Sequence, residues 1–138
     1  MIHLAPWDLF QTKAEALGAS VLWTEDTGRQ LDTAPDDFVC SAAFAVAETG
    51  SLLVTLPNAV RRAAFLAERL WVTVRAEDIV ATLDEALARV REAILRDGNR
   101  YATLMSGPSR TADIERKLTI GVHGPRALTV VVIGRRAE

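Results

Sequence analysis

The chain has 138 residues, enough for one domain with a substantial buried core. Hydrophobic residues make up 49% and charged residues 25% of it, close to the average of globular proteins, which argues against disorder. Its net charge of −2 lacks the basic excess that nucleic-acid binding normally requires, so we expect no nucleic-acid partner.

A single cysteine, Cys40, restricts the metal and redox chemistry of the chain. One thiol cannot form an intramolecular disulfide or supply the ligands of an iron–sulfur cluster or a cysteine zinc site. The first residues contain Asp8 and no basic segment, unlike a secretory signal, and the longest uncharged run, Phe38–Ala47, is too short to span a bilayer. We therefore expect a cytoplasmic protein with no membrane span, no metal site and no cofactor bound by this chain alone.

The first predicted elements are a helix, a strand and a loop. The helix is predicted to begin at Pro6 and to end before Gly18, residue types that are typical of these two positions. Residues Ser20–Thr24 predict a short strand, and Glu25–Asp37, which has no apolar period, predicts an acidic loop. The helical spacing is carried by four apolar residues, Trp7, Phe10, Ala14 and Leu17.

Two apolar runs, Phe44–Ala47 and Ser51–Leu56, follow this loop. They are separated by Glu48–Gly50, and two short runs joined by a turn that contains glycine predict a tight strand–turn–strand unit. The next segments predict a short helix over Asn58–Glu68 and a strand over Leu70–Val74.

The clearest predicted helix covers Thr82–Leu95. Thr82 and Glu85 have the spacing of a capping box, and Glu85 and Arg89 have the favourable i,i+4 spacing of opposite charges. Gly98 is expected just beyond its end. The apolar stripe consists of Leu83, Leu87, Val90 and Ile94.

The last third of the chain predicts a strand over Tyr101–Met105, a helix over Thr111–Leu118 and a buried strand over Leu128–Ile133. Strands thus alternate with helices through most of the sequence. This order indicates an α/β fold with a mostly parallel sheet flanked by helices, in a single domain that covers residues 1–138.

The connection between the predicted strand at Tyr101–Met105 and the predicted helix is a candidate anion site. Open α/β sheets bind ligands where a strand ends and a helix begins, because N–H groups and the helix dipole favour an anion there. Gly107 would let a ligand approach the backbone, and Arg110 could pair with a carboxylate or phosphate. Alternatively, the hydroxyls only cap the helix and the charges lie at the surface. The candidate ligand-binding residues are Ser106, Gly107, Ser109, Arg110, Thr111 and Asp113.

A second candidate is His123, which lies in the loop Gly121–Pro125. Two glycines and a proline would leave its imidazole little freedom, which suits a general base or a ligand contact. A purely structural turn histidine is the alternative. A metal site is not indicated, because His3 is the only other histidine.

Four ordered segments resemble the lactate-utilisation (LUD) domain family, specifically its C-type lactate-utilisation members. They are Ala47–Ser51, Ile79–Val80, Ser106–Glu115 with the string GPSRTADIE, and Gly121–Pro125 with the string GVHGP. The resemblance extends from residue 38 to residue 133.

The resemblance implies a fold similar to that of sugar-phosphate isomerases and coenzyme A transferases. It also implies a role in the oxidation of L-lactate to pyruvate, with a small anionic metabolite as ligand and with partner proteins that carry the iron–sulfur clusters. Thr49, Gly50 and Gly124 then join the candidate ligand-binding residues.

Glu48 is the candidate catalytic carboxylate that the resemblance adds. Such transferases have a catalytic glutamate in a Glu-Asn-Gly turn, to which Glu48-Thr49-Gly50 is similar. A partly buried Glu48 would act as a base or nucleophile. Alternatively, Glu48 is a turn carboxylate that accepts backbone N–H groups.

One departure from the family concerns residues between Trp23 and Phe38, where this chain has a short acidic loop in place of further strand–helix units. We therefore expect a pocket that is more open, or that a second subunit of a homo-oligomer completes. Three functions stay open: a ligand-binding or accessory protein of L-lactate oxidation, a stand-alone coenzyme A transferase- or isomerase-like enzyme that uses Glu48, and a structural or regulatory subunit with a vestigial pocket.

Overall fold

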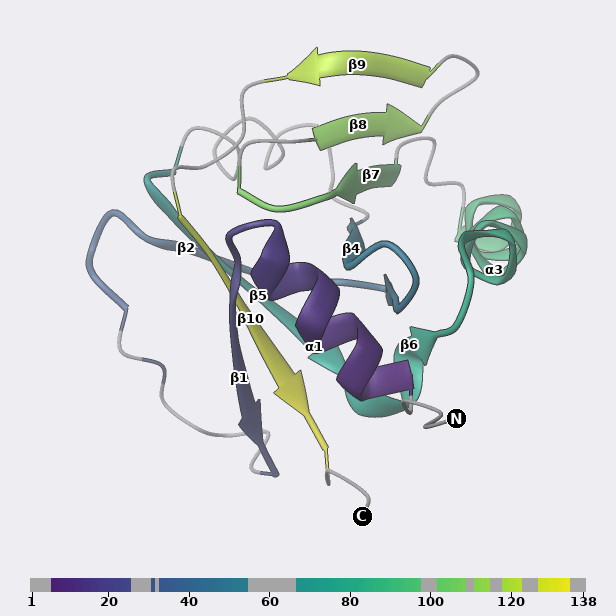
Figure 1. Cartoon of the computed structure of the whole chain (residues 1–138). Coiled ribbons are helices and arrows are strands. Elements are labelled where there is room, and N and C mark those ends of the chain that lie inside the picture. Colours follow the sequence, from purple (N-terminus) through teal and green to yellow (C-terminus); the bar gives the residue numbers. More distant parts are fainter. Residues whose placement is uncertain are drawn as a thin grey trace.

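Two β-sheets, with α1 packed on them, form the fold (Figure 1). The computed structural model describes residues 6–25, 31, 33–54, 67–97, 102–108, 111–114, 118–122 and 127–134. The elements are α1 (Pro6–Ala16), β1 (Ser20–Thr24), β2 (Phe38–Ser41), β3 (Phe44–Val46), β4 (Ser51–Val54), β5 (Arg69–Arg75), the 3-10 turn η1 (Ala76–Asp78), β6 (Ile79–Val80), α3 (Leu83–Asp97), β7 (Ala102–Met105), β8 (Thr111–Ile114), β9 (Leu118–Val122) and β10 (Ala127–Ile133).

The first sheet has the strand order β1-β10-β5-β2, and all its neighbours are parallel. Its central strands, β10 and β5, are rich in valine and largely buried, which is the pattern of a parallel sheet. The predicted strands Ser20–Thr24, Leu70–Val74 and Leu128–Ile133 are confirmed, the last two with one or two more residues. The predicted α/β fold with a parallel sheet is therefore confirmed.

The second sheet has the order β6-β3-β4-β7-β8-β9. Strand β3 pairs antiparallel with β4 across residues 47–50, which confirms the predicted strand–turn–strand unit, and parallel with β6. Strands β4, β7, β8 and β9 follow one another as antiparallel neighbours (Figure 1). The sequence had not indicated this second, mainly antiparallel sheet.

The predicted helix at Thr111–Leu118 is wrong, because β8 and β9 occupy this segment. Strand β8 pairs with β7 on one side and β9 on the other. Hydroxyl residues before apolar ones are typical of a helix start, but Thr111 and Ile114 are β-branched and suit a strand as well. The open edge of β7 provides the backbone partner that decides between the two structures.

The predicted helix Asn58–Glu68 falls almost entirely outside the described residues.

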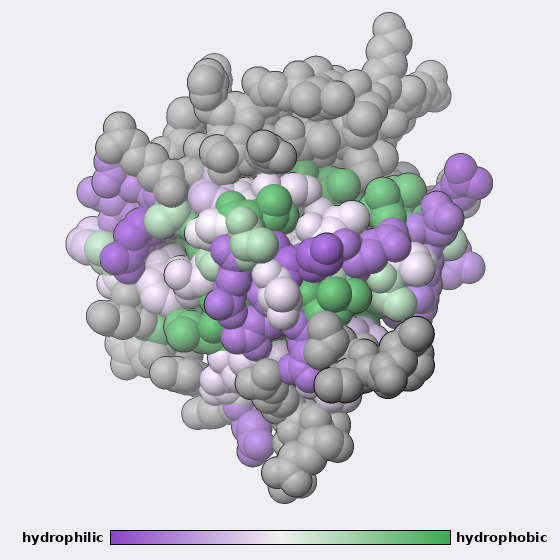
Figure 2. All heavy atoms as spheres, viewed as in Figure 1, coloured by the Kyte–Doolittle hydropathy of each residue, from purple (hydrophilic) through white to green (hydrophobic). Residues whose placement is uncertain are grey.

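Helix α1 packs through Phe10 and Ala14, which are at most 1% exposed, and this confirms its predicted apolar face. In Figure 2, hydrophilic residues follow the outer side of this helix and hydrophobic residues flank it. The core that α1 shares with both sheets includes Phe10, Ala14, Cys40, Ala45, Ala47, Leu52, Val54, Leu70, Val72, Val74, Met105, Leu128, Val130 and Val132.

Helix α3 packs on β3 and β6 through Ala86, which is fully buried beside Val46 and Val80. The predicted capping contact is present, since the Glu85 N–H donates to Thr82 Oγ1 over 3.2 Å. The predicted i,i+4 ion pair joins Glu85 and Arg89 at 3.3 Å.

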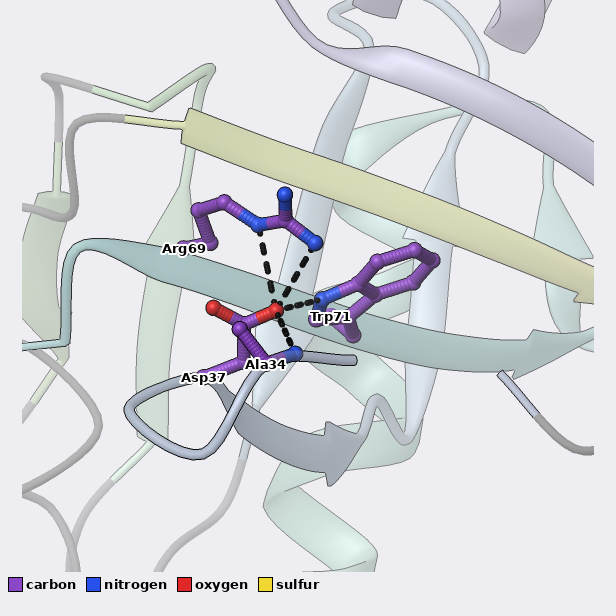
Figure 3. A network of polar contacts seen from close by, with 4 residues as sticks. All are labelled: Ala34, Asp37, Arg69 and Trp71. Carbon is purple, nitrogen blue, oxygen red and sulfur yellow. Dashed lines mark hydrogen bonds and ion pairs between the residues drawn. The ribbon is translucent and has the colours of Figure 1, made fainter. Parts of the chain in front are cut away.

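The connection from β1 to β2 ends in a polar network around Asp37 (Figure 3). Asp37 Oδ2 accepts hydrogen bonds from the Ala34 N–H over 2.9 Å, from Trp71 Nε1 over 3.0 Å and from Arg69 Nε over 3.1 Å. The carboxylate also forms an ion pair with Arg69, and its side chain is 3% exposed. The Ala34 N–H, and then Trp71 and Arg69, lower the pKa of Asp37 against the opposing effect of desolvation.

Helix α1 and Leu17, the residue that follows it, also fix two turns, at Gly50 and Gly107, by direct backbone contact. Both glycines have positive φ angles, +70° and +82°. A Cβ on Gly50 would lie 2.6 Å from the Ala14 nitrogen, and one on Gly107 would lie 2.6 Å from the Leu17 oxygen. No side chain fits either position without a shift of α1.

Replacing Asp37 tests the network at the end of the connection. Because the pKa of Asp37 is lowered in the folded state, its stabilising effect is present above the ordinary value of 3.8 and is lost as the pH falls below it. We expect Asp37→Asn to have a lower melting temperature at pH 7 and a smaller further decrease on acidification than the wild type. Asp36→Asn, at the exposed neighbouring carboxyl, is the control. Equal pH profiles of wild type and Asp37→Asn would contradict the assignment.

Alanine substitutions test the contact with α1. Gly18 also has a positive φ, +99°, but a Cβ there would have its nearest neighbours at 3.7 Å, so Gly18→Ala measures the backbone strain alone. We expect Gly18→Ala to lower the free energy of unfolding by about 1 kcal/mol, and Gly50→Ala and Gly107→Ala by about 2–4 kcal/mol, in urea titrations. Three equal losses would show that the close approach of α1 has no energetic role.

Candidate functional site

The two predicted ligand loops meet at a pair of hydroxyl groups. Ser51 Oγ and Ser106 Oγ lie 2.7 Å apart. Ser51 begins β4 and Ser106 follows β7, and the antiparallel pairing of Leu52 with Met105 places these positions side by side. Ser51 is 1% exposed and Ser106 is half-buried, so the pair lies at the boundary between core and surface.

A turn extends from each serine. On the β4 side, Thr49 is exposed and Gly50 is buried; on the β7 side, Gly107 is buried and Pro108 is half-buried. The first turn lies against Lys13 and Ala14 of α1, and the second lies against Leu17, which directly follows this helix. The structure therefore brings together Thr49, Gly50, Ser106 and Gly107, four of the residues predicted to bind a ligand.

The electrostatic basis predicted for this site requires correction. Because β8 occupies Thr111–Ile114 in place of the start of the predicted helix, the dipole argument for an anion does not apply there. The carbonyl of Leu17, an acceptor, lies against Gly107. Thr49, Ser51 and Ser106 contribute hydroxyl donors to these two turns.

The other predicted ligand-binding residues divide into two groups. Thr111 and Asp113 lie on β8, where they pair with Met105 and Thr103. The last residue of β9, Val122, pairs with Thr111, so the end of β9 lies beside the start of β8. The remaining predicted residues, Ser109, Arg110, His123 and Gly124, lie outside the described residues.

Glu48 is exposed, and its carboxylate is engaged with the start of α3. Its Oε1 accepts a hydrogen bond from the Leu83 N–H over 2.9 Å. This contact is the geometry expected of a turn carboxylate that accepts backbone N–H groups. The partial burial required for the catalytic alternative is not observed.

Cys40 is a buried free cysteine. Burial raises the pKa of the Cys40 thiol to about 11, so the thiolate, the reactive form, is scarce at neutral pH. Within the described ranges, no three histidine, cysteine, aspartate or glutamate side chains come together as a metal site would require.

None of the described helices is long and apolar enough to cross a membrane.

Sequence reasoning placed Ser51 inside a motif without assigning it a role. Its hydroxyl becomes relevant only through the pairing of β4 with β7, which brings Ser51 to Ser106, 55 positions further along the chain. The sequence contains only one signal for this hydroxyl pair. One serine stands at the start of an apolar run, and another stands at the end of a second run. That signal has meaning only when the pairing is known.

Comparison with known proteins places the chain in a family. Residues 26–133 match the model of the LUD domain. The chain is similar to lactate utilization protein C of Deinococcus radiodurans (39% identity over 107 residues, 76% of this chain and 49% of that protein) and of Geobacillus kaustophilus (31% over 121 residues, 83% and 50%). It thus spans about half the length of these curated relatives.

A solved structure supports the fold. The crystal structure of a DUF162 family protein from Deinococcus radiodurans superimposes with a TM-score of 0.64 at 19% identity, over 96% of this chain and 100% of that chain. This structural similarity concerns the fold alone. With the family match over residues 26–133, it leads to one conclusion: the chain belongs to the LUD domain family.

Proposed function

We propose that this protein is a ligand-binding or accessory component of L-lactate utilisation, in the oxidation of L-lactate to pyruvate. The relatives that cover most of this chain are named lactate utilization protein C, which supports a role in the same process. The observation that carries the proposal is the Ser51–Ser106 pair, which lies inside the matched region and joins two of its motif segments.

The hydroxyl pair suits a small 2-hydroxy acid. Each hydroxyl both donates and accepts a hydrogen bond, so the pair can reorient toward a carboxylate or toward a ligand hydroxyl. Thr49, exposed on the adjacent turn, adds a third hydroxyl. Arg110, in the connection between β7 and β8, is the cation that the sequence indicates for the carboxylate.

The oxidation of lactate to pyruvate releases two electrons and two protons, which require an acceptor. With one cysteine, this chain lacks the thiolates that hold an iron–sulfur cluster. We therefore assign the clusters to partner proteins and the binding of the organic anion to this chain. Turnover by the purified chain alone would instead favour a transferase- or isomerase-like enzyme.

Ligand titration tests the proposal. A ligand that binds only the folded state raises the melting temperature, and at about 100 times its Kd it adds about 2.7 kcal/mol of stability. We expect L-lactate and pyruvate to produce such a shift, in contrast to acetate, which lacks the second oxygen function. Ser106→Ala should raise the Kd for L-lactate about 10–150-fold, the effect of one lost hydrogen bond to a charged group.

Ser41→Ala is the matched control, because Ser41 forms a similar hydroxyl pair with Thr73, at 2.9 Å, on a different sheet. It should leave the Kd unchanged. Equal effects of the two variants, or the absence of binding by any of these acids, would overturn the proposed site.

Replacing Arg110 tests its proposed role as the cation that pairs with the carboxylate of the ligand. We expect Arg110→Ala to weaken L-lactate binding by about 1.5–3 kcal/mol, the usual range for a charged hydrogen bond, with little change in melting temperature. Arg75→Ala, at an exposed arginine paired with Glu77, is the control and should bind normally. A strongly destabilised Arg110→Ala with unchanged affinity would show that Arg110 has a structural role.

A further inference from the structure

We propose that Glu48 is a positioning residue: its carboxylate caps the start of α3 from a different element and thereby fixes the turn that carries Thr49, Gly50 and Ser51. The part of this inference that concerns a ligand rests on the proposed function. The structural part stands on hydrogen bonds among described residues alone.

Three hydrogen bonds join the turn to the segment that precedes and begins α3. The Ala47 N–H donates to the Val80 carbonyl over 2.8 Å, and the Glu48 N–H donates to the Ala81 carbonyl over 3.2 Å. The Glu48 carboxylate then accepts the Leu83 N–H over 2.9 Å. The first two contacts continue the parallel pairing of β3 with β6, and the third carries it onto the helix.

The start of a helix needs such acceptors. The first N–H groups of a helix have no carbonyl partner within it, and Leu83 is the first residue of α3. The Thr82 hydroxyl accepts the Glu85 N–H. Glu48 satisfies the Leu83 N–H and places a negative charge at the positive end of the helix, where it is stabilising. The cap of α3 is therefore shared between its own sequence and the β3–β4 turn.

The same turn is held at its other end by α1. The Gly50 N–H closes the turn onto the Val46 carbonyl over 2.9 Å, and the Gly50 α-carbon lies against the backbone of Lys13 and Ala14. Ser51 follows directly and reaches Ser106. Glu48 and Gly50 thus anchor the turn to α3 and α1, and Thr49 and Ser51 take their positions from these two anchors.

Comparison of Glu48→Ala with Thr82→Ala tests this role. Each variant removes one side-chain acceptor from the first turn of α3, so both should destabilise that helix. Only Glu48 belongs to the ligand turn. We expect Glu48→Ala to speed hydrogen exchange of the Gly50 amide about fivefold or more, and to raise the Kd for L-lactate about fivefold. Thr82→Ala should do neither, and Glu48→Gln, which keeps the acceptor oxygen, should restore both.

The two measurements separate this inference from the proposed function. If L-lactate does not bind the wild type, the proposed function fails, and the exchange of the Gly50 amide still decides the role of Glu48. Equal exchange in Glu48→Ala and Thr82→Ala would overturn the positioning role. So would a catalytic turnover by the wild type that Glu48→Gln abolishes while exchange and affinity stay unchanged, because Glu48 would then act on the reacting atoms.

Discussion

The contact between α1 and the turns at Gly50 and Gly107 is the constraint on which the candidate site depends. The helix carboxyl end approaches both turns more closely than any Cβ permits, so backbone packs on backbone. Phe10 and Ala14 hold the helix in place, because they are buried in the core that it shares with both sheets. The relative position of the two turns, and with it the Ser51–Ser106 contact, therefore depends on this core packing as well as on the pairing of β4 with β7.

The connection from β1 to β2 joins two strands that are not neighbours in the sheet. The two strands are parallel and lie at opposite edges of the first sheet, so the chain must return across the sheet, a task usually performed by a helix. The described end of this connection, residues 33–37, is held by Asp37, which binds Arg69 and Trp71 (Figure 3). Leu22 and Val39, on the two edge strands, are 40% and 48% exposed.

The sequence correctly predicted the elements that are marked by a local pattern of residues. Valine-rich β5 and β10 were predicted as strands, and the pair Thr82 and Glu85 marked the start of α3 correctly. Strand β8 was missed because Thr-Ala-Asp-Ile is too short to show a period, and its identity depends on the edge of β7. The candidate site shows the same difference between what local motifs predict and what depends on pairing between distant segments. The two loops were identified from their motifs, but the role of Ser51 and the contact of Glu48 with Leu83 arise from pairings between distant segments.

The charged groups around the Ser51–Ser106 pair indicate which positive groups would pair with a bound anion. Neither described helix offers a positive end to this place: Glu48 already occupies the start of α3, and α1 brings the Leu17 carbonyl toward Gly107. Hydroxyls alone orient a carboxylate without neutralising it, so a bound 2-hydroxy acid requires a side-chain cation or a group from a partner. Lys13, whose Cβ lies beside Gly50, and Arg110 are the cations that we expect to meet this requirement. Because a side-chain cation on an exposed surface is screened by water and salt, affinity should fall as ionic strength rises. A partner that covers the site would exclude this solvent and strengthen the same contacts, which is a physical reason for such a chain to act within a complex.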